Sequence, residues 1–128
     1  MAAEAPTLLS IIELGGYPDF TPLYRRAGFE VERATSMRKA LTLLRTLRPA
    51  VVVSEFVYSP MYSTRLSNLE SLFAGLQRDA PGARLIVLFD RENGHHLQAL
   101  QSRFAIFQTL AFPISEKALA DALARAAR

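Results

Sequence analysis

Short apolar runs alternate with amphipathic segments along the whole chain, and this alternation constrains the fold more than any other feature. Five runs predict strands, at residues 8–14, 29–34, 50–56, 85–89 and 105–110. Segments with apolar residues at helical spacing stand between them and after the last. Five β-α units in 128 residues predict a parallel sheet with helices on both faces.

The expected helices carry start and stop signals. The first is expected over residues 19–27, with Gly28 as a C-terminal glycine, and the fourth over residues 95–103. The other three are expected to begin where a short hydroxyl or amide side chain can cap the first turn. These caps are Thr35 or Ser36, Ser67 or Asn68, and Ser115.

The strand at residues 50–56 is apolar on both faces, as a central parallel strand should be. The expected arrangement is an α/β/α sandwich with a five-stranded sheet in the flavodoxin-like order 2-1-3-4-5. Sites in such sheets lie at the carboxyl ends of the strands. No linker or sequence repeat interrupts the pattern. We therefore expect residues 1–128 to form a single domain, with residues 1–6 as a flexible N-terminus.

Composition excludes several classes of protein. The chain has no cysteine, so disulfides and thiolate metal ligands are excluded. It has no apolar run of membrane-spanning length and no signal-peptide pattern, which favours a cytoplasmic protein without membrane contact. The net charge is +3, but the arginines are spread along the chain, which disfavours nucleic-acid binding. The adjacent His95 and His96 would diverge on a helix, and no metal site is predicted.

Residues 28–56 carry the most specific pattern. Gly28-Phe29-Glu30-Val31 is followed by Ala40-Leu41 and then by Pro49 and the strand that ends at Glu55. This frame resembles the receiver domain of two-component response regulators, of the CheY-like superfamily. The turn at residues 112–114 is similar to the Lys-Pro-Phe turn that follows the fifth strand of that family. The resemblance covers nearly the whole chain.

The resemblance also implies which parts of the family's phosphorylation site are missing. Glu55 stands at the position of the phosphoacceptor aspartate. The acidic pair that holds magnesium falls on residues 11 and 12, or places one member on Glu13 after a shift of one residue. Phe89 replaces the Ser or Thr after the fourth strand, and Phe112 replaces the lysine before Pro113. Phosphoryl transfer depends on positioning and charge neutralisation, which these residues do not supply. We expect a degenerate receiver, or pseudo-receiver, that is not phosphorylated, with no catalytic residue, no enzymatic activity and no cofactor.

Two interpretations of Glu55 stay open. Its longer side chain could extend a negative charge to where a phosphoryl group would sit, and so hold one signalling state without chemistry. Alternatively, it is a carboxylate at the end of a strand, paired with an arginine such as Arg65 or Arg91.

The segment after the third predicted strand is rich in aromatic side chains. Aromatic and methionine residues on an accessible loop are typical of protein interfaces. The alternative is that they fold back and fill the site. The predicted interaction loop comprises Phe56, Val57, Tyr58, Met61 and Tyr62, with Tyr17 joining from the first loop.

We therefore favour a single-domain signal-transduction module that binds a protein in trans: a kinase, a regulator or a second copy of itself. The resemblance implies an output or homodimer surface on the fourth helix, fifth strand and fifth helix, with His96, Gln98, Gln101, Arg103, Gln108 and residues 116–128. The alternative is a small-molecule sensor. Its apolar pocket would be floored by Phe89 and Phe112, with Glu13 and Glu55 as polar points for a planar or cationic ligand.

Overall fold

The computed structural model describes residues 5–58 and 67–127, and the structural statements below concern those residues. Five strands form one sheet: β1 (Thr7–Ile11), β2 (Glu30–Ala34), β3 (Val51–Glu55), β4 (Arg84–Phe89) and β5 (Gln108–Ala111). Their order is β2-β1-β3-β4-β5 and every neighbouring pair is parallel. The sheet order predicted from the sequence is confirmed.

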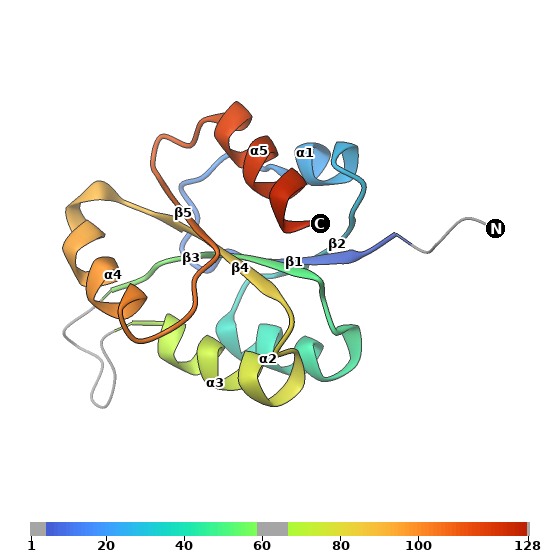
Figure 1. Ribbon diagram of the computed structural model, residues 1–128, viewed down its shortest axis with the longest axis horizontal. Coiled ribbons are helices and arrows are strands. Elements are labelled where there is room, and N and C mark those ends of the chain that lie inside the picture. Colours follow the sequence, from blue (N-terminus) through green and yellow to red (C-terminus); the bar gives the residue numbers. More distant parts are fainter. Residues whose placement is uncertain (1–4, 59–66, 128) are drawn as a thin grey trace.

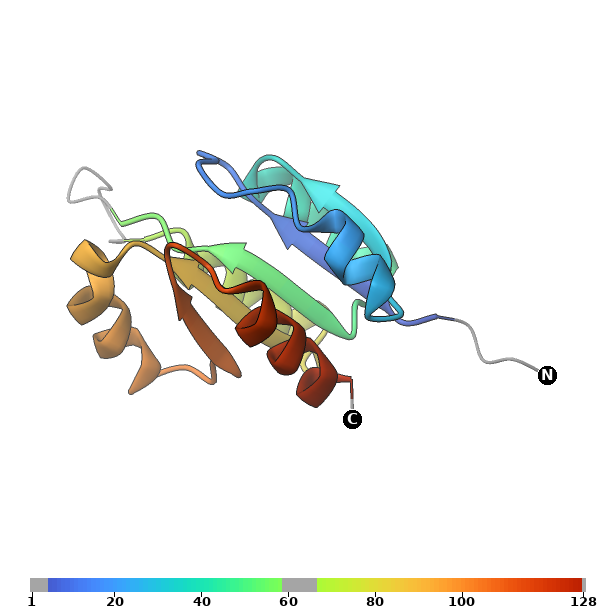
Figure 2. The same ribbon diagram turned by 90° about the horizontal axis from the view of Figure 1, so that it is seen from above.

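The helices lie on both faces of the sheet (Figures 1 and 2). They are α1 (Thr21–Arg26), α2 (Met37–Leu47), α3 (Leu69–Asp79), α4 (Gly94–Gln101) and α5 (Glu116–Ala126), and a short 3-10 turn, η1 (Arg91–Asn93), precedes α4. Helices α1 and α5 cover one face, while α2, α3 and α4 pack on the other. Each face has its own apolar core.

The middle of the sheet is the most deeply buried part of the molecule. Every residue of β3 is buried, from Val51 to Glu55. Parallel strands covered on both faces read as continuous apolar runs, which explains this segment. Glu55 is the charged exception, and it stands at the carboxyl end of the strand, beside Leu88 of β4.

The predicted caps Ser36 and Ser115 are confirmed, and Ser67 Oγ accepts a hydrogen bond from the Leu69 N–H at the start of α3, at 3.2 Å. Ser36 Oγ accepts a hydrogen bond from the Lys39 N–H, and Ser115 Oγ accepts one from the Ala118 N–H, at 3.1 and 3.2 Å. Asn68 precedes α3, but its amide does not cap that helix. Its amide bonds to the segment after β3 instead.

Two strand boundaries differ from the sequence prediction by three residues, and the others differ by at most one. β1 ends at Ile11 rather than at residue 14, because the backbone N–H groups of Glu13 and Leu14 turn away from the ladder toward the Glu55 carboxylate. β5 begins at Gln108 rather than at residue 105, although the Phe107 N–H still donates to Leu85 at 2.8 Å. In the described part of the chain, no helix is long and apolar enough to cross a membrane.

Candidate functional site

The carboxyl ends of β1, β3, β4 and β5 surround an open cleft of about 290 Å³. This strand-end cleft lies where a sheet of this topology places its ligands. It is lined by residues from four connections, among them two carboxylates, Glu55 and Asp90, and four aromatic rings. The aromatic residues are Tyr17, Phe56, Tyr58 and Phe112.

Glu55 is held by the loop that follows β1. Its side chain is nearly inaccessible, with 3 % of the residue exposed. The Leu14 N–H donates to Oε1 at 2.6 Å, and the Glu13 N–H donates to the same oxygen. Burial raises the pKa of the Glu55 carboxyl, and these backbone donors partly oppose that rise. The carboxylate is therefore engaged inside the protein rather than presented to solvent.

These contacts bear on the interpretation that Glu55 pairs with an arginine. No ion pair joins Glu55 to Arg91 within the described residues, and Arg65 lies outside them. Among the described residues, the hydrogen-bond partners of the carboxylate are backbone amides. A charge held by amides of the β1–α1 loop is fixed in place, whether or not it imitates a phosphoryl group.

Glu13 does not place a second carboxylate beside that of Glu55 to form a pair of metal ligands. Its side chain is exposed, its backbone N–H donates a hydrogen bond to Glu55, and its negative charge contributes to the raised pKa of the Glu55 carboxyl. The parallel register pairs Ile11 with Ser54, so that the apolar Ile12 follows beside Glu55. Among the described residues, no group of three or more His, Cys, Asp or Glu side chains is placed to hold a metal ion.

The two phenylalanines do not form the floor that the sequence suggested. Phe112 stands on the rim of the cleft, 43 % exposed, with its ring 5.8 Å from that of Tyr17 in an edge-to-face contact. Phe89 does not line the cleft. It packs under the start of α4, where a Cβ on Gly94 would lie 3.4 Å from its ring. The prediction of a pocket floored by both rings is wrong, because Phe89 turns into the core beside α4. The peptide bond between Phe112 and Pro113 is cis.

The predicted interaction loop divides into different environments. Phe56 is 5 % exposed and belongs to the core, so it cannot serve as an accessible contact residue. Val57 and Tyr58 are half-buried, and Tyr17 is half-buried at the cleft. Burial and the neighbouring carboxylates raise the pKa of Tyr17 to about 12. Met61 and Tyr62 lie outside the described residues.

A contact that the sequence gave no reason to expect joins the cleft to α4. The rings of Tyr58 and His96 stack in parallel with centroids 3.6 Å apart. Tyr58 lines the strand-end cleft, and His96 belongs to the fourth helix. No spacing pattern relates these two residues, because their contact arises from the tertiary arrangement of β3 and α4.

A pH dependence follows from the environment of Glu55. Its pKa in the folded protein lies above the ordinary value of 4.5, so the folded state binds more protons than the unfolded state above that value. The contribution of Glu55 to stability is fully present below pH 4.5 and is lost as pH rises through its raised pKa. Urea unfolding of the wild type and the Glu55→Gln variant is measured between pH 4 and 7. The free energy of unfolding of the wild type minus that of the variant should fall as pH rises. A difference that rises with pH would contradict this.

The comparisons with known proteins agree with the geometry. No family model matches the chain, and no curated protein matches it either. Solved structures do match. The chemotaxis response regulator CheY4 of Vibrio cholerae is 20% identical, with 95% of this chain and 98% of that chain covered and a TM-score of 0.72. The chain has the receiver fold.

Two further structures have the same fold. A response regulator receiver domain protein from Clostridium thermocellum is 19% identical, with 94% of this chain and 93% of that chain covered and a TM-score of 0.69. The receiver domain of Francisella response regulator 1452 is also 19% identical, with 96% and 99% covered and a TM-score of 0.67. The TM-scores show the same fold, and the low identities carry no information about the role of each residue.

Proposed function

We propose that this protein is an atypical receiver domain, spanning residues 1–128, that acts in signal transduction by binding another protein and is not phosphorylated. One observation carries the proposal. The carboxylate at the position of the acceptor is a buried glutamate whose Oε1 receives the backbone N–H groups of Glu13 and Leu14. With Oε1 engaged by two backbone N–H groups, the carboxylate is held in place by those bonds and is not free to align with a phosphoryl group in the cleft.

The residues around the cleft support the same conclusion. Phosphoryl transfer needs cations or hydrogen-bond donors that neutralise charge on the transferred group. The described lining residues include no lysine or arginine, and the position before Pro113 holds an exposed phenylalanine. Such an aromatic rim contacts another protein more readily than it contacts a phosphate.

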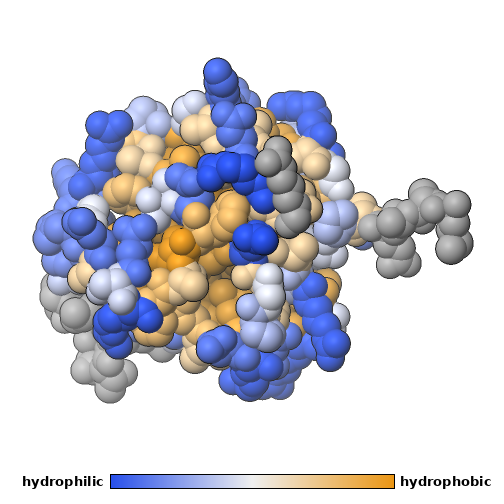
Figure 3. Space-filling view, viewed as in Figure 1, coloured by the Kyte–Doolittle hydropathy of each residue, from blue (hydrophilic) through white to orange (hydrophobic). Residues whose placement is uncertain are grey.

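A surface for a protein partner is available on α4, β5 and α5. β5 is an edge strand, so among the described residues one side of its backbone has no neighbouring strand. Its four residues are half-buried. In Figure 3, hydrophobic side chains gather in the middle of the face that looks out over β5, with hydrophilic residues around them. Within this surface Gln108 accepts a hydrogen bond from Arg125 at 2.9 Å, while Gln98, Gln101 and Arg103 are exposed. The Tyr58–His96 stack links this surface to the strand-end cleft.

The loss of phosphorylation is tested by titrating the labelled protein with magnesium and beryllofluoride while recording backbone amide NMR shifts. We expect no saturable shift at Glu13, Glu55 or Phe112. A working receiver domain serves as the control that the reagents form the phosphoryl analogue. Saturable local shifts at these residues, lost in the Glu55→Gln variant, would make the protein a functional phosphoreceiver.

The partner surface is tested separately. Sedimentation velocity over a wide concentration range reports whether a second copy binds, and the Ala105→Arg variant places a charge on an exposed position just before β5. Thr42→Arg, on the exposed side of α2, is the control. If the partner is a second copy, Ala105→Arg should weaken self-association and Thr42→Arg should not. If the protein stays monomeric, the same pair of variants is compared for binding to candidate kinases and regulators, and equal binding by both would overturn the proposed surface.

A second candidate function, a sensor of organic cations, rests on the lining of the same cleft. Glu55 and Asp90 contribute negative charge, while Tyr17, Tyr58 and Phe112 contribute aromatic rings. Cations bind over aromatic faces, particularly where carboxylates lie close by. Saturable shifts around the cleft with a tetramethylammonium or guanidinium salt, absent with sodium chloride, would favour this candidate.

A further inference from the structure

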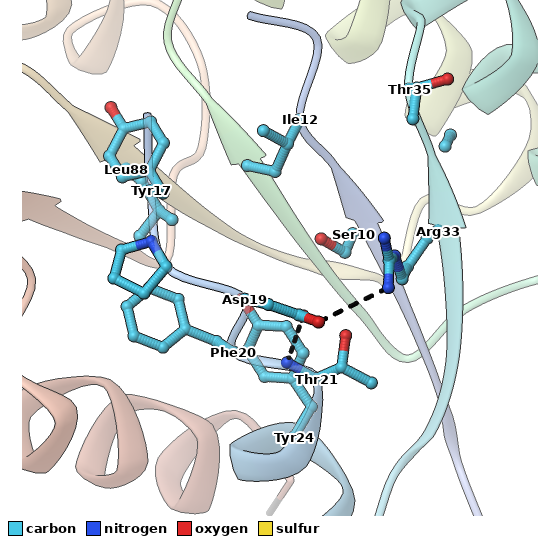
Figure 4. Close-up of a pocket in the computed structure, with 12 residues that line it drawn as sticks. Ser10, Ile12, Tyr17, Asp19, Phe20, Thr21, Tyr24, Arg33, Thr35 and Leu88 are labelled. Carbon is cyan, nitrogen blue, oxygen red and sulfur yellow. Dashed lines mark hydrogen bonds and ion pairs between the residues drawn. The ribbon is translucent and has the colours of Figure 1, made fainter. Parts of the chain in front are cut away.

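A second cavity lies on the face of the sheet covered by α1 and α5. It has a volume of about 190 Å³ and extends under the β1–α1 loop, from β2 across β1 to Leu88 of β4. Figure 4 shows the side chains that surround it. We call it the α1 cavity.

The α1 cavity exists because the first helix is short. Helix α1 has 6 residues, whereas α2, α3 and α5 each have 11. Gly15 and Gly16 adopt positive φ angles of 83° and 87°, and the chain reaches its first helical residue only at Thr21. The sheet near the ends of β1 and β2 is therefore covered by an irregular loop rather than by a helix.

Two nearly buried hydroxyl groups face the α1 cavity without a hydrogen-bond partner in the described part of the chain. Ser10, on β1, is 9 % exposed, and Tyr24, on α1, is 3 % exposed. Both line the cavity, and neither hydroxyl oxygen is sealed from it. Ser10 projects from β1 into the space between Ile12 and Asp19 (Figure 4). Both hydroxyls are therefore open to water, or to a ligand that occupies the cavity in its place.

An ion pair stands at the mouth of the α1 cavity. The guanidinium of Arg33, on β2, lies 3.6 Å from the carboxylate of Asp19, and both side chains are more than half exposed, at 61% and 63%. Hydrogen bonds from Thr21 and the nearby Arg33 lower the pKa of Asp19, so it is ionised at neutral pH. The mouth thus presents one positive and one negative group side by side (Figure 4).

About half of the cavity lining is apolar. Ile12, Phe20 and Leu88 line the cavity together with the ring of Tyr24. A pocket with apolar walls and a few polar groups at fixed positions is the usual form of a small-molecule site. The volume of about 190 Å³ corresponds to roughly six water molecules, which is the size of one amino acid.

We propose that the α1 cavity binds a small zwitterion of the α-amino acid class. The ligand's carboxylate pairs with Arg33 and its ammonium group pairs with Asp19. Its apolar side chain enters between Ile12, Phe20 and Leu88, and its polar atoms satisfy Ser10 and Tyr24. A ligand with both charges exchanges one loose ion pair for two, whereas a ligand with one charge leaves Asp19 or Arg33 unmatched.

The α1 cavity also adjoins the strand-end cleft. Tyr17 lines both, and its ring contacts Phe112 on the rim of the cleft. A ligand in the α1 cavity should therefore change the environment of Phe112 through Tyr17. The proposal does not depend on the loss of phosphorylation, because none of the charged residues that it uses belongs to the strand-end cleft.

The test compares three compounds that share one branched hydrocarbon body: L-leucine, 4-methylpentanoate and 3-methylbutylamine. Each is titrated into the labelled full chain while backbone amide shifts are recorded. L-Leucine should give saturable shifts at Ser10, Thr21 and Arg33, with a smaller response at Phe112. The carboxylate alone and the amine alone should bind at least about tenfold more weakly. An equal response to 4-methylpentanoate, or no saturable response to L-leucine, L-alanine or L-phenylalanine, would overturn the proposal.

Variants then assign the contacts. Arg33→Gln and Asp19→Asn should each weaken L-leucine binding by about tenfold or more, and Tyr24→Phe should weaken it by a smaller factor. Arg26→Gln, on the exposed side of α1 and outside the cavity lining, is the matched control for Arg33→Gln. Unchanged binding in both charge variants, with amide spectra that show a folded protein, would mean that L-leucine binds elsewhere and would contradict the assignment.

Discussion

Replacing Glu55 by lysine should lower the free energy of unfolding by about 3–5 kcal/mol, the usual cost of a buried charge without compensation. The side chain at this position is buried, and two backbone N–H groups converge on its carboxylate. A lysine would lose the acceptor and bring an ammonium group toward those N–H dipoles. Because small domains are stable by only about 5–15 kcal/mol, the variant should lose a large part of its stability and unfold at a much lower urea concentration.

The control for Glu55→Lys is Glu13→Lys. It makes the same change of net charge at a residue of the β1–α1 loop that contacts Glu55. The Glu13 side chain is exposed, its backbone N–H donates the hydrogen bond to Glu55, and its charge acts on Glu55 only as a minor cause of the raised pKa. Its substitution should alter stability by less than about 0.5 kcal/mol. Urea denaturation of the two variants measures the difference. If both variants lose the same stability, the Glu55 carboxylate is not held by the backbone amides as described.

Much of the fold could be predicted because its determinants are local. The run of valines at residues 51–53 predicts a buried strand by itself, and Ser36 and Ser115 cap helices through N–H groups three residues ahead. The alternation of five such strands with helices then leaves few permitted topologies. For the same reason the position of Glu55 at the carboxyl end of β3 followed from counting along the sequence frame.

The parts that could not be predicted depend on contacts between distant residues. The end of β1 is set by hydrogen bonds from Glu13 and Leu14 to a residue 42 and 41 positions away. The direction of Phe89 depends on the packing of α4, and that of Phe112 depends on Tyr17. The α1 cavity results from the late start of α1, which was expected at residue 19 and begins at Thr21. This shift of two residues is small in the sequence. As a result of the shift and of the loop before α1, an irregular loop and not a helix lies over this part of the sheet.

The second large effect concerns Asn68, whose amide joins the end of β3 to the start of α3. Its Oδ1 accepts a hydrogen bond from the Val57 N–H, and its Nδ2 donates to the Glu55 carbonyl, both at 2.8 Å. Asn68 is 5 % exposed, so Asn68→Ala removes both bonds without admitting much water. Leaving buried polar groups unpaired costs about 1–3 kcal/mol each. The Glu55 carbonyl keeps a bond from the Ser54 hydroxyl, so we expect a total loss of about 2–3 kcal/mol.

Asn93→Ala is the matched control, because the Asn93 side chain makes no hydrogen bond with the described residues. Thermal and urea unfolding should separate the two alanine variants by about 2 kcal/mol. Asn68→Asp sharpens the test: it keeps the acceptor for Val57 but places a carboxylate oxygen against the Glu55 carbonyl. It should therefore be no more stable than Asn68→Ala. If Asn68→Asp matched the wild type, the bond to the Glu55 carbonyl would not matter, and the contribution of Asn68 would rest on the bond from the Val57 N–H.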